Sequence, residues 1–177
     1  RKRKYVIERV EEAVSFKQKV VVFTGRRADC DRLEKVIRSK VNAPIFAAHG
    51  GTSSEERDKI RHLYMNTTGP CVLVGTGHAW GESVNLQDTD LALFVMLPWT
   101  PKNILQWEGR FSRLGQQRPV MISYIIAEGT VDEHIADILL DKLPAVHEVA
   151  GDEDAQGIEA AFIQTGEDLL SRISSLI

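Results

Sequence analysis

The sequence predicts an α/β fold with a mostly parallel central sheet and helices on both faces. Short apolar runs of strand length alternate along the chain with longer stretches whose apolar residues recur at helical spacing, which is typical of βαβ units. The runs do not alternate with polar residues, as expected for strands that are buried on both faces. Glycine, histidine and hydroxyl residues gather directly after them, at the sheet edge where such folds bind ligands.

Each predicted strand is a short run rich in apolar residues, many of them β-branched. The five segments are Lys19–Thr24, Ile45–Ala48, Cys71–Val74, Leu91–Leu97 and Val120–Ala127. Gly25 closes the first run and Pro44 precedes the second, so a residue that interrupts regular structure marks one end of each.

The predicted helices carry apolar residues at helical spacing or a clear start signal. They are Tyr5–Gln18, Asp29–Lys40, a helix from Thr52 or Ser53 to about Tyr64, a helix from Pro101 to about Arg113, and a helix opened by Thr130. A hydroxyl side chain can cap the third helix, whose first turn carries two glutamates. Thr100 and Pro101 form a favoured start for the fourth.

The composition is that of a globular protein and excludes several other classes. A chain of 177 residues suits one domain or slightly more, and it can bury roughly 70% of its unfolded surface without a metal or a disulfide. Cys30 and Cys71 stand apart from any cysteine–histidine set, so a zinc knuckle and a disulfide framework are excluded. No apolar run is long enough to cross a bilayer. We expect a cytoplasmic protein and, because Arg1 opens the chain instead of Met, a fragment of a longer one.

Charge is distributed unevenly along the chain. Residues 1–118 hold 20 Lys and Arg against 13 Asp and Glu, whereas residues 119–177 hold 2 against 12. A basic body with an acidic tail favours nucleic-acid or nucleotide contact in the first part. The alternative is that charge segregates by chance along solvated helix faces.

The chain lacks a phosphate-binding loop of its own. None of its 13 glycines is followed by the lysine that a Walker A loop requires. Gly75, Thr76 and Gly77 resemble the start of a dinucleotide-binding loop, but Trp80 stands where that pattern has its third glycine. No cluster of residues predicts a metal site.

The helix from Pro101 combines an apolar face with a polar one. At 100° per residue the apolar residues of the segment fall within one arc, which we take as the core face; they are Ile104, Trp107, Phe111 and Leu114. Gln106, Arg110 and Arg113 fall within a second arc and project together beside the sheet. Guanidinium groups suit phosphate oxygens, although a solvated basic face would show the same pattern.

Six segments resemble, in order, the motifs of superfamily-two helicases. They are Lys19–Arg26 (motif IV), His49–Arg57 (motif IVa), Val72–Leu86 (motif V), Pro98–Pro101 (the DWNP segment), Gln106–Gln116 (QWEGRFSRLGQ, motif VI, QxxGRxxR) and Gly129–Ile135 (the GTIEERI brace). The Leu-Gly-Gln ending of motif VI is closer to the SWI/SNF-type branch of DNA translocases. The resemblance covers about residues 5–142.

The resemblance implies the C-terminal RecA-like domain of a two-domain motor, a three-layer fold with a mostly parallel sheet. This domain would span residues 1–142, and residues 143–177 would form an accessory helical segment. ATP and Mg²⁺ would be bound mainly by an N-terminal RecA-like domain of the same protein. Arg110 and Arg113 would act as catalytic arginine fingers, and Gly81, Glu82 and Gln106 would lie on the nucleotide side. The fragment alone is predicted to be inactive.

The same resemblance assigns the DNA backbone as the partner of the loops after the strands. The residues implied are Thr24, Gly25, Arg26, His49, Gly50, Thr76, Gly77, Asn85 and Trp99. Each also has a plain structural interpretation: the threonines can cap strand ends, the glycines can serve turns, His49 can be a hydrogen-bonded loop residue, Asn85 can be a turn residue bonded to its own backbone, and Trp99 can pack its loop on the sheet.

The chain also departs from the family pattern. Trp80 and Ser83 replace two glycines of motif V, and Pro98 stands where the DWNP segment has its acidic residue. These changes favour a bacterial or phage-encoded protein over a nuclear one. Two rival interpretations stay open, a non-enzymatic nucleic-acid-binding module and the second domain of an RNA helicase.

Overall fold

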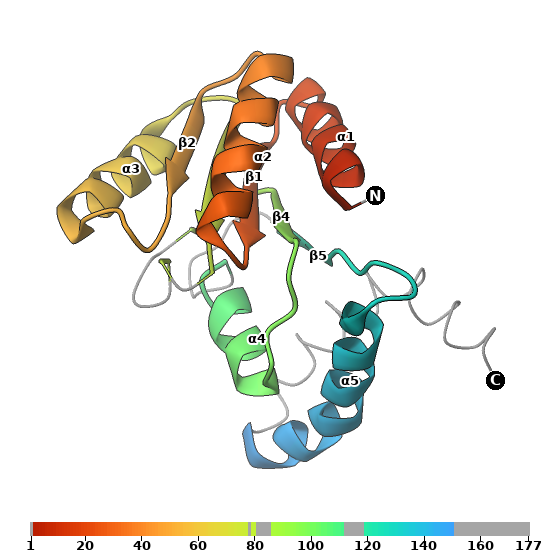
Figure 1. Cartoon of the computed structure of the whole chain (residues 1–177). Helices are drawn as coiled ribbons and strands as arrows, with labels where there is room; N and C mark the ends of the chain where they lie inside the picture. The colour runs from red at the N-terminus through yellow and green to blue at the C-terminus, as the bar shows by residue number, and fades with distance from the viewer. Residues whose placement is uncertain (1, 78, 81–85, 112–118, 151–177) are drawn as a thin grey trace.

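The computed structural model describes residues 2–77, 79–80, 86–111 and 119–150 (Figure 1). Four residues with predicted roles, Gly81, Glu82, Asn85 and Arg113, lie outside these ranges. No helix within the described part of the chain is long and apolar enough to span a membrane.

The described residues form a five-stranded sheet in which every neighbouring pair of strands is parallel. The strands are β1 (Lys19–Thr24), β2 (Ile45–Ala48), β3 (Cys71–Thr76), β4 (Leu91–Phe94) and β5 (Met121–Tyr124), in the spatial order β2-β3-β1-β4-β5. The predicted α/β fold with a parallel sheet is confirmed. β1 lies at the centre and every residue of it is buried, which explains its uninterrupted apolar sequence.

Helices cover both faces of the sheet, giving three layers. The helices are α1 (Lys2–Ser15), α2 (Arg27–Lys40), α3 (Ser54–Asn66), α4 (Pro101–Glu108) and α5 (Val131–Ala150). Val20 and Val22 of β1 pack with the apolar residues of α1 and α2, whereas Val21 and Phe23 pack with those of α3, α4 and α5. This division follows from the alternation of side chains along a strand.

Several elements end at residues other than the predicted ones. α1 stops at Ser15, and Lys17 beyond it adopts a positive φ of 60°. β4 ends at Phe94 and β5 spans only Met121–Tyr124, because backbone pairing between the two stops there although apolar residues continue. α3 begins as predicted, with the Ser53 side chain accepting a hydrogen bond from Glu56 N.

The largest correction concerns α4, which ends at Glu108 and not at about Arg113. The backbone N–H of Arg110 donates to Trp107 O (3.3 Å), and that of Phe111 donates to Glu108 O (2.9 Å), which are turn contacts and not helical ones. α5 continues through residue 150, and the division of the chain near residue 142 stays a prediction.

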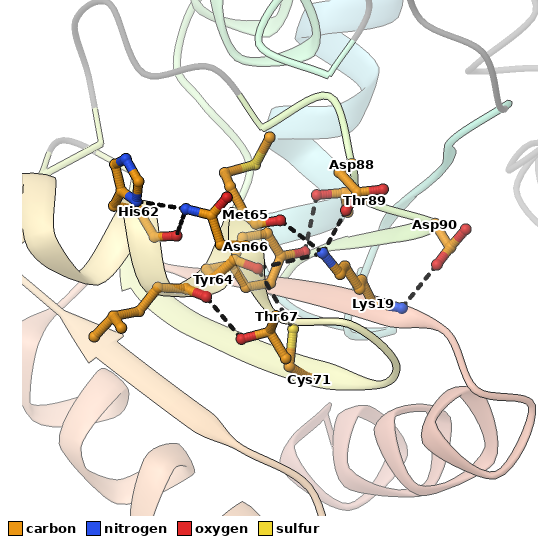
Figure 2. A network of polar contacts seen from close by, with 11 residues as sticks. Lys19, His62, Tyr64, Met65, Asn66, Thr67, Cys71, Asp88, Thr89 and Asp90 are labelled. Carbon is orange, nitrogen blue, oxygen red and sulfur yellow. Dashed lines mark hydrogen bonds and ion pairs between the residues drawn. The ribbon is translucent and has the colours of Figure 1, made fainter.

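A polar network fastens the amino end of β1 to the end of α3 (Figure 2). The Lys19 ammonium is buried and donates to the backbone oxygens of Tyr64 (3.3 Å) and Met65 (3.1 Å) and to the Asp88 carboxylate. Lys19 N also donates to Asp90 Oδ2 (2.8 Å). The network satisfies carbonyls at a helix C-terminus, and it lies at the opposite end of the strands from the predicted ligand loops.

Candidate nucleotide and nucleic-acid site

The predicted DNA loops meet at the carboxyl edge of three neighbouring strands. Thr24 of β1 and Thr76 of β3 are register partners, and Gly77 N donates to Thr24 O (3.2 Å). β2 pairs with β3 on the other side, with Ala48 opposite Gly75, so the loop that starts at His49 lies next in the row. The parallel register alone therefore brings together three segments that are distant in sequence.

Both threonines of this edge are buried. The Thr24 side chain is 1% exposed, and its hydroxyl lies within hydrogen-bond distance of Arg26 O (3.2 Å) and Gly75 O (3.3 Å). Thr76 is 7% exposed, and its backbone oxygen accepts from the N–H groups of Ala79 (3.0 Å) and Trp80 (3.3 Å). In this conformation the threonines hold the loops in shape, and the exposed residues of the edge include Gly25 and Arg26.

The His49 loop is a compact turn held by its own hydrogen bonds. His49 Nδ1 accepts from Gly51 N (3.0 Å), and the backbone N–H of His49 donates to Thr52 Oγ1 (3.1 Å). His49 Nε2 lies 3.7 Å from Asp31 Oδ1 on α2. The hydrogen-bonded interpretation of His49 is therefore correct. Gly50 is exposed, and a Cβ placed on it would meet nothing within 4 Å.

Trp80, the departure from the motif V pattern, is a core residue. Its side chain is fully buried, and a Cβ placed on Gly75 would lie 2.1 Å from Trp80 Nε1. Glycine at position 75 is therefore required by close packing. In the same way, a Cβ on Gly77 would lie 2.9 Å from Trp107 Cζ2, and one on Gly25 would lie 2.9 Å from Met96 Sδ. The glycines of two predicted DNA loops let large side chains pack directly against the backbone.

The residues after β3 are also held from α3. Arg57 Nη1 donates to Ala79 O, and Arg57 Nη2 donates to Ser54 Oγ (3.1 Å). The sequence analysis gave Arg57 no role, because nothing in the sequence around Arg57 indicates that its guanidinium reaches the loop after β3. It ties α3, which follows the His49 loop, to the turn after Thr76.

The structure corrects the expected polar face of α4. Gln106 is exposed, whereas Arg110 is only 4% exposed, so the two do not share a solvent-facing arc. The angular argument fails because it extends helical geometry past Glu108, where the helix has ended. Arg110 O accepts from Leu86 N (3.0 Å), which joins the turn after α4 to the end of the motif V segment. The predicted core role of Trp107 is confirmed, since it is 4% exposed and stacks on Phe94.

Trp99 is 69% exposed, so the interpretation that it packs its loop on the sheet is wrong. Its indole lies at the surface, in the segment between β4 and α4. A large exposed aromatic ring next to a predicted nucleic-acid loop is compatible with stacking on a base.

Glu108, the last residue of α4, is a buried acid. Its side chain is 7% exposed, and Glu108 Oε1 accepts a hydrogen bond from the Tyr124 hydroxyl of β5 (2.7 Å). Burial raises the pKa of Glu108 to about 7, although the bond from Tyr124 opposes the shift. The sequence analysis missed this residue. A signal existed, because Glu108 lies about 40° from Ile104 around the helix, at the margin of the core arc.

Comparison with known proteins identifies the class. Residues 1–115 match the family model described as the helicase conserved C-terminal domain. The chain is 30% identical over 139 residues to the SWI/SNF-related matrix-associated actin-dependent regulator of chromatin subfamily A-like protein 1 of Xenopus laevis, covering 78% of this chain and 14% of that protein. It is 33% identical over 137 residues to an uncharacterized ATP-dependent helicase of Bacillus subtilis, covering 77% of this chain and 24% of the relative.

Solved structures share this fold. The C-terminal part of the Fun30 ATPase domain superimposes with a TM-score of 0.69 at 19% identity, over 76% of this chain and 43% of that one. The Sulfolobus solfataricus SWI2/SNF2 ATPase core in complex with dsDNA gives 0.64 at 24% identity, over 92% and 34%. The shared fold confirms the RecA-like α/β prediction.

The chain thus has the fold of the C-terminal RecA-like domain of a superfamily-two helicase. It belongs to the helicase conserved C-terminal domain family and is a domain of the SWI/SNF type, as the motif resemblance predicts. The chain spans 14% of the length of the Xenopus laevis relative and 24% of the length of the Bacillus subtilis relative.

Two glycines of the site allow a matched test of the packing. Gly75→Ala should destabilise the domain by roughly 1–3 kcal/mol, because the new methyl group meets the buried Trp80 ring and the core must shift. Gly50→Ala should change stability by no more than about 0.5 kcal/mol, because its Cβ enters open space. Urea unfolding of both variants measures the difference, and equal midpoints would contradict the assigned packing.

The buried acid predicts a pH-dependent stability. Because the pKa of Glu108 is about 7 in the folded chain and near 4.5 in the unfolded one, the folded state binds the extra proton between these values. Its stability therefore falls as pH rises from about 4.5 to 7. Glu108→Gln keeps an acceptor for Tyr124 and has no charge, so it should be more stable than wild type by about 2–3 kcal/mol at pH 8 and equal to it near pH 4.5. Denaturation at both pH values measures this; a constant difference would contradict it.

Proposed function

We propose that this chain is the C-terminal motor half of an ATP-dependent DNA translocase or helicase. It would grip the DNA backbone and supply arginine side chains to ATP bound on an N-terminal RecA-like domain. The contact between Gly77 and Trp107 is the observation that carries the proposal. Gly77 belongs to a predicted DNA loop and packs against the ring of Trp107, which stands three residues before Arg110, so the proposed DNA edge lies against the end of the helix that leads to Arg110.

The residues of this chain fit only a part of an ATP site. The sequence has no Gly-Lys loop, and the described residues contain no group of three or more His, Cys, Asp or Glu that could hold a metal ion. ATP and Mg²⁺ would therefore be held mainly by the N-terminal domain. From this side Arg110 and Arg113 would stabilise charge that develops on the phosphate oxygens, with Gly81, Glu82 and Gln106 beside the nucleotide.

The DNA contacts would be made by backbone groups and by Arg26, without reading the base sequence. Exposed backbone at Gly25 and Gly50 and the Arg26 guanidinium lie on the same sheet edge. The likeness to an ATPase core whose structure was determined with dsDNA supports DNA as the nucleic acid. The exposed Trp99 ring would stack on a base.

Substitution of Arg110 tests the proposed chemistry. In the full-length protein Arg110→Lys should lower kcat by on the order of 10³-fold or more, because an ammonium lacks the planar fork that a finger presents to phosphate. Steady-state ATP hydrolysis at saturating DNA measures this. Since Arg110 is buried, Arg110→Ala should also lower the melting temperature.

Two controls complete the experiment on Arg110. DNA binding by Arg110→Lys should match wild type, because the role proposed for Arg110 is toward nucleotide and not toward the DNA strand. The isolated chain should hydrolyse no ATP, since it lacks the Walker lysine. Hydrolysis by Arg110→Lys within about threefold of wild type would refute the arginine-finger role, whereas a full-length wild type that hydrolyses no ATP at saturating DNA would favour a nucleic-acid-binding module without ATPase activity.

Substitution of Arg26 tests the DNA edge. Arg26→Ala should weaken binding about equally for all DNA sequences and reduce the slope of log affinity against log salt by about one, because one phosphate contact is lost. Lys40→Ala is the matched control: Lys40 is exposed at the end of α2, at the other end of the strands, and its loss should leave the slope unchanged. Fluorescence titrations between 50 and 200 mM salt make the measurement. An unaltered slope for Arg26→Ala would exclude the contact.

A further inference from the structure

The end of α4 is fastened to the sheet by two consecutive residues. The Trp107 ring stacks on Phe94 of β4, with centroids 5.5 Å apart, and Phe94 stacks in turn on Tyr124 of β5 at 4.8 Å. Glu108 then accepts the hydrogen bond from the Tyr124 hydroxyl at 2.7 Å. Trp107 and Glu108 therefore hold the same three-ring stack, one by ring contact and the other by a hydrogen bond.

The same two residues shape the turn that carries Arg110. The Trp107 carbonyl accepts from Arg110 N (3.3 Å), and the Glu108 carbonyl accepts from Phe111 N (2.9 Å). Phe111 is fully buried and packs 6.2 Å from Phe94, ring centroid to ring centroid. Any movement of Glu108 along or around the helix axis would therefore be passed to Arg110 through the backbone.

The hydrogen-bonded pair of Glu108 and Tyr124 is an unexpected choice for the buried layer between α4 and β5. Its neighbours in the apolar cluster include Ile122, Ile135 and Leu139, and an apolar pair of similar volume would fill the same space. Hydrophobic burial is non-directional, whereas a hydrogen bond between two buried groups has one favourable geometry. The hydrogen bond between Glu108 and Tyr124 therefore fixes the position and orientation of the end of α4.

We propose that Glu108 and Tyr124 are positioning residues for the nucleotide reaction: their hydrogen bond fixes the end of α4 and thereby sets where Arg110 is presented. The inference rests on the proposed function of Arg110. Neither residue touches nucleotide or DNA in this account; both act through the turn.

The test uses the full-length protein and removes the bond while keeping the ring stack. Tyr124→Phe should lower kcat for ATP hydrolysis at least about tenfold, because a displacement of about 1 Å at a reacting group can cost up to 10²-fold. The KM for ATP and the DNA concentration that gives half-maximal stimulation should stay within twofold of wild type.

Tyr64→Phe is the matched control for lost stability. The Tyr64 hydroxyl is equally buried and bonds to Thr89 Oγ1 at 2.9 Å, on the same face of the sheet but near the start of β4. Its removal should lower the melting temperature by a similar amount and leave kcat unchanged. A purely structural role for Tyr124 predicts the same kcat for both variants.

Substitutions at Glu108 give a second, independent measurement. Glu108→Gln keeps an oxygen acceptor and should retain most of kcat, whereas Glu108→Leu fills the space without an acceptor and should lose as much kcat as Tyr124→Phe. These two variants decide the matter if Tyr124→Phe does not fold. Equal kcat for Gln and Leu would overturn the proposal, as would a Tyr124→Phe enzyme as active as Tyr64→Phe.

The outcome is separable from that of the proposed function. If Arg110→Lys is inactive and Tyr124→Phe is fully active, the positioning role alone is refuted. If Arg110→Lys hydrolyses ATP like wild type, the proposed function fails first, and a loss of kcat in Tyr124→Phe cannot be assigned to Arg110; the positioning role is then refuted as well.

Discussion

The parallel pairing of β1 with β3 and β4 is the constraint on which the rest of the structure depends. It aligns the carboxyl ends of strands that are separated by 52 residues of sequence (Thr24 and Thr76) and by 71 residues (Phe23 and Phe94), and it leaves Thr24 beside Thr76. Once this register is set, the loops after β1, β2 and β3 must lie in one row. The buried Thr24 hydroxyl and the hydrogen bond from Gly77 N to Thr24 O then hold the ends of β1 and β3 together beneath the surface of this edge. The exposed surface of the site is thus backbone and arginine, held from beneath by hydroxyl groups.

Much of the fold is readable from the sequence because its determinants are local. Apolar runs predict the strands, and the cap at Ser53 predicts the start of α3, since these signals depend on neighbouring residues only. Ends of elements are less predictable: β4 stops at Phe94 while apolar residues continue, because strand length depends on whether a partner strand is present. The end of α4 likewise depends on the contacts of Trp107 and Glu108 with β4 and β5, which no helical periodicity contains.

The candidate site shows the same division between local and tertiary information. The order of the motifs identifies the family and the loops, and the sequence also shows where glycine stands in those loops. The sequence does not show why two of these glycines are needed. Gly75 and Gly77 are required by the close approach of Trp80 and Trp107, which occurs only in the folded chain. Arg57 and Glu108 were missed for a related reason. A guanidinium that reaches another loop leaves no pattern in its own segment, and the position of Glu108 at the margin of the core arc does not show that its carboxyl group bonds to another strand.

The side chain of Arg110, for which a role in the motor reaction is proposed, is buried in the core. Arg110 is 4% exposed, and the backbone on either side of it is bonded to Trp107, Glu108 and Leu86. A packed interior resists small displacements, so a turn held in this way transmits movement of the domain without absorbing it. In the proposed motor, the backbone of the turn that bears Arg110 would therefore move with the whole domain when it closes on its partner. The proposed DNA edge, which packs against Trp107 through Gly77, would then move by the same displacement.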